Sequence, residues 1–190
     1  LLDRIIIVGN AELTETGYVQ SSSSNIGDKV DICAPGSDIL SSVRDNEYMR
    51  KSGTSMASPV VAGIASLVWA VDEELTGAAV KKLVCENTKD IVSPTEERFF
   101  DHLNFKSYPM VNAKLAVEAA LRQKGNFYDV TLTTDSKKEI TFINENGDEF
   151  IFETNSDGFL NCVLETGNYT LKTELIETVI TVSGNTAIEI

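Results

Sequence analysis

The stretch from Gly53 to Trp69 constrains the fold of this chain more than any other. It places Ser55 between a glycine and Pro59, and an apolar run fills positions 60–69. Proline is tolerated in the first turn of a helix, where a backbone N–H has no intrahelical partner anyway. We therefore expect Ser55 at or just before the N-terminus of a helix whose first turn holds Pro59. The run is apolar almost all round and rich in Ala and Gly, which predicts a central, tightly packed helix.

A serine in this place can serve as a nucleophile. Unpaired N–H groups and the helix dipole favour negative charge at a helix N-terminus. A hydroxyl held there can attack a carbonyl carbon and leave the resulting oxyanion facing hydrogen-bond donors. The plainer alternative is that Gly53 and Ser55 only cap a buried core helix.

Residues 53–59 read Gly-Thr-Ser-Met-Ala-Ser-Pro, and Val-Ala-Gly follows at 61–63. This run resembles the nucleophile motif of the subtilisin-like serine proteases (subtilases), and all seven residues of the motif match. One departure is Val60, where most members carry a histidine that is not part of the catalytic machinery. The Gly-x-Ser-x-Gly elbow of α/β-hydrolases fits less well, because Ala57 stands at its second glycine position. A capped core helix would explain Gly-x-Ser alone, but not seven matched residues.

Two further segments resemble the same family and stand in the same order. Residues 24–27 read Ser-Asn-Ile-Gly and residues 30–36 read Val-Asp-Ile-Cys-Ala-Pro-Gly, as similar segments do ahead of the nucleophile in subtilases. Residues 109–113 resemble the start of the alanine-rich helix that ends the family's catalytic domain. The resemblance therefore implies an α/β fold, in which residues 1–124 form the C-terminal portion of a subtilisin-like parallel-sheet domain.

Local patterns predict the elements of this first domain. Arg4–Val8 is apolar on both faces, which predicts a buried strand of a parallel sheet, and the polar stretch 10–28 predicts a loop. Helical periodicity after a polar capping residue predicts helices over Thr76–Asn87 and Asn112–Arg122. We also expect a strand over 29–36, a hairpin of 38–42 with 47–51, and a long loop over 88–108.

Beyond Lys124 the apolar pattern changes to a period of two. Tyr128, Val130 and Leu132 alternate with polar residues, and turn sequences recur about every 8–12 residues. Seven or so short strands of this kind predict a small β-sandwich over residues 125–190. Residues 157–159 and 167–171 resemble the transthyretin-like modules (carboxypeptidase regulatory type) at the ends of secreted enzymes. The predicted architecture is thus an α/β domain, 1–124, followed by an all-β transthyretin-like sandwich, 125–190.

Charge and composition exclude several classes of partner. The net charge is −13, of which −9 falls in residues 125–190, and such an acidic chain is a poor ligand for nucleic acid or anionic membranes. The longest apolar run, Val60–Val71, is too short and too rich in small residues for a membrane span. Cys33, Cys85 and Cys162 are an odd number without metal-site spacing, so we expect buried free thiols. Together with the family resemblance, this composition favours a secreted, bacterial protein.

The resemblance implies one catalytic residue in this chain, Ser55, and places Gly53 and Thr54 at the oxyanion and primary specificity sites. Subtilases order their triad as Asp, His, Ser, whereas the only histidine, His102, follows Ser55 and is interpreted as a loop residue. Asn10 lies one strand after the family's oxyanion asparagine and is not that residue. A serine hydroxyl without its base is a poor nucleophile, so we expect this chain alone to be inactive.

Our functional hypothesis is a subtilase-type serine endopeptidase that hydrolyses peptide bonds through an acyl-enzyme on Ser55. The chain starts in what we interpret as a strand already under way, so we expect the missing Asp and His from an upstream segment or a companion chain. The alternative is a pseudoprotease, a binding or regulatory protein that keeps the fold. The sandwich alone could be an adhesion or carbohydrate-binding module, although a spacer role fits better. No metal ligand set is identifiable; calcium is a habit of the family, and no residue here identifies its site.

Overall fold

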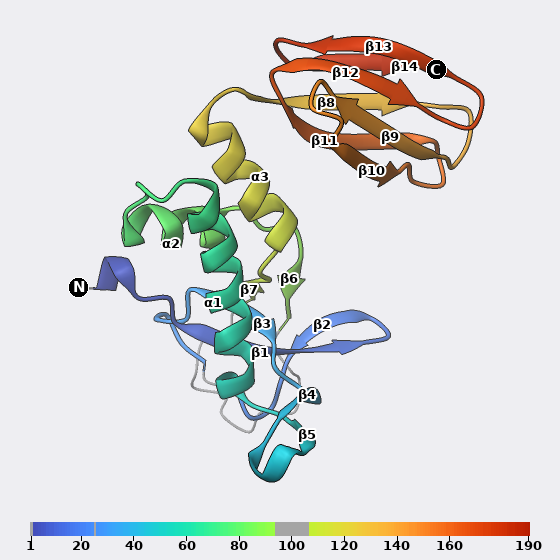
Figure 1. Ribbon diagram of the computed structural model, residues 1–190. Coiled ribbons are helices and arrows are strands. Elements are labelled where there is room, and N and C mark those ends of the chain that lie inside the picture. Colours follow the sequence, from blue (N-terminus) through green and yellow to red (C-terminus); the bar gives the residue numbers. More distant parts are fainter. Residues whose placement is uncertain (1, 25, 94–106) are drawn as a thin grey trace. The chain divides into compact units, whose positions relative to one another are not determined.

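The computed structural model describes residues 2–24, 26–93 and 107–190 (Figure 1). The chain forms two compact units, Leu1–Ala120 and Leu121–Ile190. Helix α3, Ala113–Lys124, contains the boundary between them, four residues before the boundary expected at 124.

The first unit is built on a three-stranded sheet of order β2-β1-β3. Strand β1, Val8–Thr14, pairs in parallel with β3, Ile32–Pro35, and forms an antiparallel hairpin with β2, Gly17–Gln20. The parallel pairing of the first strand is as expected, but two of our boundaries were wrong. Arg4 ends a short 3-10 helix, Leu2–Arg4, and the predicted loop over 10–28 begins with a hairpin that extends to Gln20.

Both corrections have local physical causes. The backbone N–H of Ile7 donates to the side chain of Asp31 at 2.8 Å, where a strand would use a neighbouring backbone carbonyl. The second half of β1 is exposed at Glu12, Leu13 and Thr14. Exposed strand positions accept polar residues, so the composition of this segment does not distinguish it from a loop.

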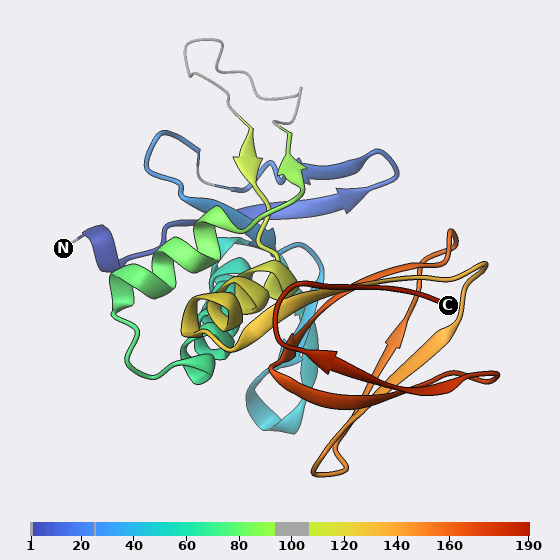
Figure 2. The same cartoon turned by 90° about the horizontal axis from the view of Figure 1, so that it is seen from above.

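The two faces of the sheet carry different cores. Ile32 and Ala34 of β3 face the helices, whereas Cys33 between them faces the short strands β6, Ile91–Val92, and β7, Tyr108–Pro109. Figure 2 shows the helices on one side of β1 and β3 and the pair β6–β7 on the other. The helix-side core is formed by these buried residues: Ile32, Ala34, Ala57, Val61, Ile64, Val68, Leu83, Val84, Ala116 and Ala120.

Three helices and a hairpin complete this unit. Helix α1, Thr54–Val71, packs on β1, β3 and α2, Gly77–Glu86. The predicted caps are confirmed, because Thr76 accepts a hydrogen bond from the N–H of Ala79 and Asn112 accepts one from the N–H of Leu115. The predicted hairpin is also confirmed, as β4, Ile39–Ser42, pairs with β5, Tyr48–Lys51. Part of the predicted loop 88–108 is occupied by β6 and β7, and residues 94–106 lie outside the described residues.

Helix α1 is buried on one face only, so the central, tightly packed helix that we expected is covered only in part by this chain. Ala57, Val61, Ile64 and Val68 are buried, whereas Leu67 and Trp69 are 55% and 52% exposed. By length and composition alone, α1 is the one helix among the described residues that could cross a membrane. The core helix of a water-soluble protein meets the same criterion, and only 22% of α1 is buried among the described residues.

The second unit consists of seven strands in two sheets. A four-stranded sheet has the order β10-β9-β12-β13 and a three-stranded sheet the order β11-β8-β14. Side chains of both sheets form one core around Leu132, Phe142 and Leu171, so the predicted period of two places apolar residues inward. The strands are β8, Phe127–Thr133; β9, Glu139–Asn144; β10, Glu149–Glu153; β11, Phe159–Glu165; β12, Gly167–Lys172; β13, Glu177–Val182; and β14, Thr186–Glu189.

The cysteines are free, as expected. Cys33 and Cys162 are buried, while Cys85 is half-buried. Burial raises the pKa of the Cys33 thiol to about 11 and is the main reason that the pKa of Cys85 is also raised to about 11. Because the thiolate is the reactive form, these two side chains are not nucleophiles at neutral pH.

Lys81 of α2 joins the start of β1 to the start of β3. Its Nζ donates to the carbonyl oxygen of Ile5 at 2.7 Å and to Oδ2 of Asp31 at 2.9 Å. The same carboxylate oxygen accepts from the N–H of Ile7. The side chains of Lys81 and Asp31 are only 21% and 26% exposed, so the ion pair is partly shielded from water.

We expect Lys81→Met to lower the free energy of unfolding by about 1–3 kcal/mol, because it leaves a half-buried carboxylate without its charged partner. The matched control is Arg50→Met, which breaks the exposed pair Arg50–Asp38, with side chains 58% and 74% exposed. Such a surface pair contributes about 0–1 kcal/mol. Urea unfolding of both variants measures the difference, and equal losses would contradict the role assigned to Lys81.

Candidate active site

Ser55 is the second residue of helix α1, and its side chain is exposed. Gly53 is the N-cap residue, with φ 151° and ψ 167°, a conformation that residues with a side chain rarely adopt. The carbonyl oxygen of Gly53 accepts from the N–H groups of Met56 at 2.9 Å and Ala57 at 3.3 Å. The tight glycine turn therefore presents the serine at the open end of the helix.

Pro59 is not in the first turn, which corrects our placement of it. It is the sixth residue of α1, four positions after Ser55. A helical N–H normally donates to the carbonyl four residues earlier, and proline has none to give. The proline is tolerated because the carbonyl oxygen that loses its partner belongs to the exposed first turn, at Ser55.

The turn before Ser55 is fixed to the end of β3. The N–H of Gly53 donates to the carbonyl oxygen of Gly36 at 2.8 Å. Gly36 is buried and directly follows β3, whose last two residues are Ala34 and Pro35. Since β3 is paired with β1 and packed against α1, the sheet and the helix together determine where the serine lies.

The sequence did not reveal that Asn10 packs beside the turn that precedes Ser55. Asn10 lies in β1, is fully buried, and its side chain reaches Ser37, the residue after Gly36. The signal available in the sequence was a polar residue directly after the apolar run of residues 5–9.

Gly53, Thr54 and Ser55 lie together at the start of α1, and no base lies beside the serine among residues 2–24, 26–93 and 107–190. In the part of the chain that the structure describes, no group is hydrogen-bonded to the Ser55 hydroxyl. His102, interpreted from the sequence as a loop residue, lies outside the described residues. Within those same residues, no group of three or more His, Cys, Asp or Glu side chains could hold a metal ion.

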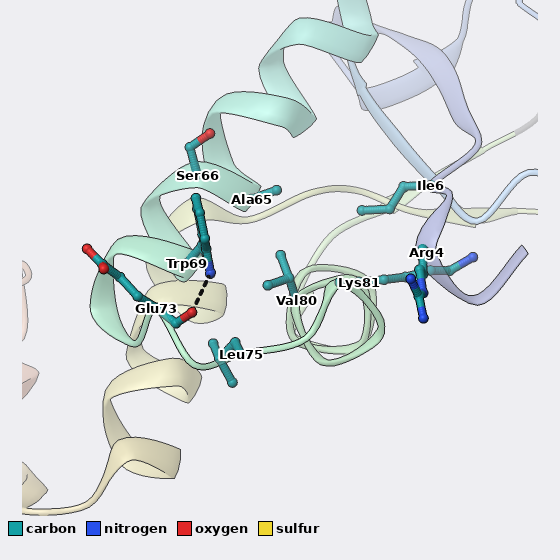
Figure 3. Close-up of a pocket in the computed structure, with 10 residues that line it drawn as sticks. Arg4, Ile6, Ala65, Ser66, Trp69, Glu73, Leu75, Val80 and Lys81 are labelled. Carbon is teal, nitrogen blue, oxygen red and sulfur yellow. Dashed lines mark hydrogen bonds between the residues drawn. The ribbon is translucent and has the colours of Figure 1, made fainter. Parts of the chain in front are cut away.

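A separate cavity of about 430 Å³ lies at the other end of α1 (Figure 3). Trp69 forms part of its wall, and the indole Nε1 donates to the carbonyl oxygen of Glu73 at 2.9 Å. At a rise of 1.5 Å per residue, Trp69 is about 20 Å along the helix from Ser55, so this cavity is not part of the serine site. Its lining residues are Arg4, Ile6, Ala65, Ser66, Trp69, Glu73, Leu75, Gly77, Val80 and Lys81.

The chemistry of the site follows from the helix terminus. The first N–H groups of α1 have no intrahelical partners, and the helix dipole favours negative charge beside them. An acyl-transfer reaction at Ser55 would develop its oxyanion close to these donors. The arrangement could serve as a nucleophile with donors for an oxyanion if other residues supplied a base.

Sequence comparisons identify relatives over the first unit. The sequence profile of the subtilase family matches residues 2–125. The halolysin-like extracellular serine protease Nep of Natrialba magadii is 35% identical over 103 residues, which are 54% of this chain and 18% of that protein. The thermophilic serine proteinase of Bacillus sp. (strain AK1) is 40% identical over 91 residues, 48% of this chain and 22% of that protein.

A solved structure shares the fold. Fervidolysin from Fervidobacterium pennivorans, a keratinolytic enzyme related to subtilisin, aligns with a TM-score of 0.51 at 15% identity, over 98% of this chain and 36% of that one. This chain spans about a fifth of the length of the first curated relatives that it matches. With the family profile covering more than half of its residues, and with serine proteases as its relatives, the chain belongs to the subtilase family.

Proposed function

We propose that the complete protein containing this chain is a serine endopeptidase whose nucleophile is Ser55. One observation carries the proposal: an exposed serine in the first turn of α1, inside a fully matched subtilase motif. Membership of a family with serine protease relatives supports a peptidase function in general. The specific reaction is hydrolysis of peptide bonds through an acyl-enzyme on Ser55.

The general base and its orienting carboxylate come from residues upstream of this chain. Subtilisin orders its triad as Asp, His and Ser, and the one histidine here, His102, follows the serine. The upstream residues are part of the same polypeptide or of a companion chain produced by cleavage. These 190 residues alone are inactive, since a serine hydroxyl with its ordinary high pKa needs an adjacent base.

The residues before the nucleophile bind the substrate. Gly53 and Thr54 form part of the wall of the primary specificity pocket, since they adjoin Ser55 at the open end of α1. The backbone N–H of Ser55 stabilises the oxyanion, with the hydroxyl of Thr54 beside it. Removal of one side-chain donor from the oxyanion hole of subtilisin costs about 3–4 kcal/mol. The substrates are peptides or proteins.

The protein is secreted, and its second unit is an appendage to the catalytic domain. The relatives from Natrialba magadii and Yarrowia lipolytica are described as extracellular proteases, which supports secretion. Residues 125–190 form a transthyretin-like sandwich with a spacer or stabilising role. Its two sheets around one core are consistent with this assignment.

The test is covalent labelling of the complete protein with a fluorophosphonate, which reacts only with an activated serine. We expect the label on Ser55, located by mass spectrometry, and none on Ser55→Ala. The matched control is Ser66→Ala, an exposed serine of the same helix whose hydroxyl donates to the carbonyl of Ala62 at 2.9 Å; this variant should label at the wild-type rate. A folded wild-type protein that takes no label would instead be a pseudoprotease.

A further inference from the structure

Asn10 is fully buried in the middle of β1, and its polar groups are satisfied by serines. Its backbone N–H donates to Oγ of Ser24 at 2.8 Å. The carboxamide Nδ2 lies 3.2 Å from Oγ of Ser37, and that hydroxyl in turn lies 3.4 Å from Oδ1. Burying an amide is unfavourable unless it is hydrogen-bonded, so the Asn10–Ser37 pair holds the carboxamide in one orientation.

That carboxamide presses against the turn that carries the nucleophile. A Cβ atom added to Gly36 would lie 2.5 Å from Oδ1 of Asn10, 2.7 Å from the carbonyl oxygen of Gly53, and 3.0 Å from Cβ of Ala57. The Cα of Gly36 is therefore enclosed by Asn10, by the N-cap residue of α1 and by the first buried residue of that helix. The carbonyl of Gly36 also accepts the N–H of Gly53.

We propose that Asn10 is a positioning residue for Ser55. The contact series runs from the Asn10 carboxamide to Gly36, from Gly36 to Gly53, and from Gly53 to the nucleophile two residues later. Close-packed interiors transmit displacements rather than absorb them, so a gap at Asn10 lets Gly36 and then Gly53 move. Misplacement of a reacting group by about 1 Å can reduce the rate about 100-fold. This inference rests on the proposed function of Ser55.

The plainer interpretation is that Asn10 only stabilises the core, and the variants are chosen to separate the two. Asn10→Ala removes the carboxamide. Ser37→Ala removes only its partner hydroxyl, and Ser37→Thr keeps that hydroxyl. The matched control is Tyr108→Phe, which removes from the same unit a hydroxyl that donates to the carbonyl of Gly27 and accepts from its N–H.

The experiment measures fluorophosphonate labelling of Ser55, kcat and KM for a short peptide, and Tm, all in the complete protein. We expect Asn10→Ala to slow labelling and lower kcat about 10–100-fold with KM changed less than about twofold. Ser37→Ala should show a smaller loss that Ser37→Thr restores. Tyr108→Phe should lower Tm without slowing the labelling. Amide exchange at Gly53 should accelerate in Asn10→Ala and not in Tyr108→Phe, a readout that needs no catalysis.

Two results would overturn the inference. One is wild-type labelling of Ser55 in Asn10→Ala, or in Ser37→Ala if the first variant does not fold. The other is slower labelling of Ser55 in both Asn10→Ala and Tyr108→Phe, in proportion to the loss of Tm in each variant. If the wild-type protein takes no label at Ser55, the proposed function fails first, and the role of Asn10 in positioning a nucleophile fails with it. If the wild-type protein labels at Ser55 and Asn10→Ala labels at the same rate, this inference alone is refuted and the proposed function stands.

Discussion

A protein made of residues 1–190 alone should hydrolyse a short peptide at least about 10⁴-fold more slowly than the complete protein. This expectation rests on the proposed function, in which the base lies upstream: the single histidine, His102, follows Ser55 in the sequence, whereas the subtilisin triad places its histidine before the serine. Loss of triad members in subtilisin lowers kcat by about 10⁴–10⁶. Turnover is measured with both purified proteins at equal concentration, with circular dichroism to confirm that each is folded.

Two controls make this comparison decisive. Ser55→Ala in the complete protein should cause a loss of similar size, because triad residues act as a unit and their effects are not additive. Addition of the purified upstream segment to residues 1–190 should restore turnover that depends on Ser55. The prediction would be contradicted if the 190 residues alone turned over substrate and Ser55→Ala abolished this turnover. His102 would then be the candidate base.

Gly158→Ala should destabilise the second unit by about 2–5 kcal/mol, the largest effect that we expect from a single methyl group. Gly158 has φ +76°, and its Cβ would overlap the carbonyl oxygen of Thr134 and lie 2.7 Å from that residue's Oγ1. A left-handed conformation costs about 1–2 kcal/mol for a residue with a side chain, and overpacking a rigid neighbour adds about 1–3 kcal/mol. The neighbour cannot yield easily, since the N–H of Thr134 donates to the carbonyl of Gly158 at 2.8 Å.

Gly147→Ala isolates the conformational part of this cost. Gly147 also lies in a turn of the second unit, with φ +85°, and an added Cβ would have no neighbour within 4 Å. We expect a loss of about 1–2 kcal/mol. Amide exchange in β8 and β11 reports the stability of this unit, while the fluorescence of Trp69 reports on the first one. Equal losses for the two alanines would show that contact with Thr134 is not important.

Signals that act over a few residues allowed much of the fold to be predicted. The caps at Thr76 and Asn112 lie next to the N–H groups that they bind, and the β4–β5 hairpin joins neighbouring segments. The β1–β2 hairpin was missed because its exposed half has the composition of a loop. The position of Pro59 within α1 was also hard to infer from the sequence. The free-energy cost of a proline inside a helix depends on whether the carbonyl oxygen that it leaves without a hydrogen bond is exposed to water.

Seven consecutive residues were enough to propose Ser55 as the nucleophile, but they did not predict which residues pack around it. Asn10 and Ser37 are 27 positions apart, and only the parallel pairing of β1 with β3 brings them together. No periodicity or spacing rule links two such residues. Long-range packing around the site is therefore the part of the arrangement that required the structure.

Because Pro59 has no N–H, one hydrogen bond is missing beside Ser55, the candidate nucleophile. The carbonyl oxygen of Ser55 accepts no backbone hydrogen bond from the next turn of the helix. The first turn of α1 nevertheless remains bonded on both sides. Gly53, two residues before Ser55, donates its N–H to the carbonyl oxygen of Gly36 at the end of the sheet. Gly53 also accepts from the N–H groups of Met56 and Ala57, and the hydroxyl of Ser58 donates to the carbonyl oxygen of Thr54. The gap left by Pro59 is therefore confined to one carbonyl oxygen, in the same residue as the candidate hydroxyl.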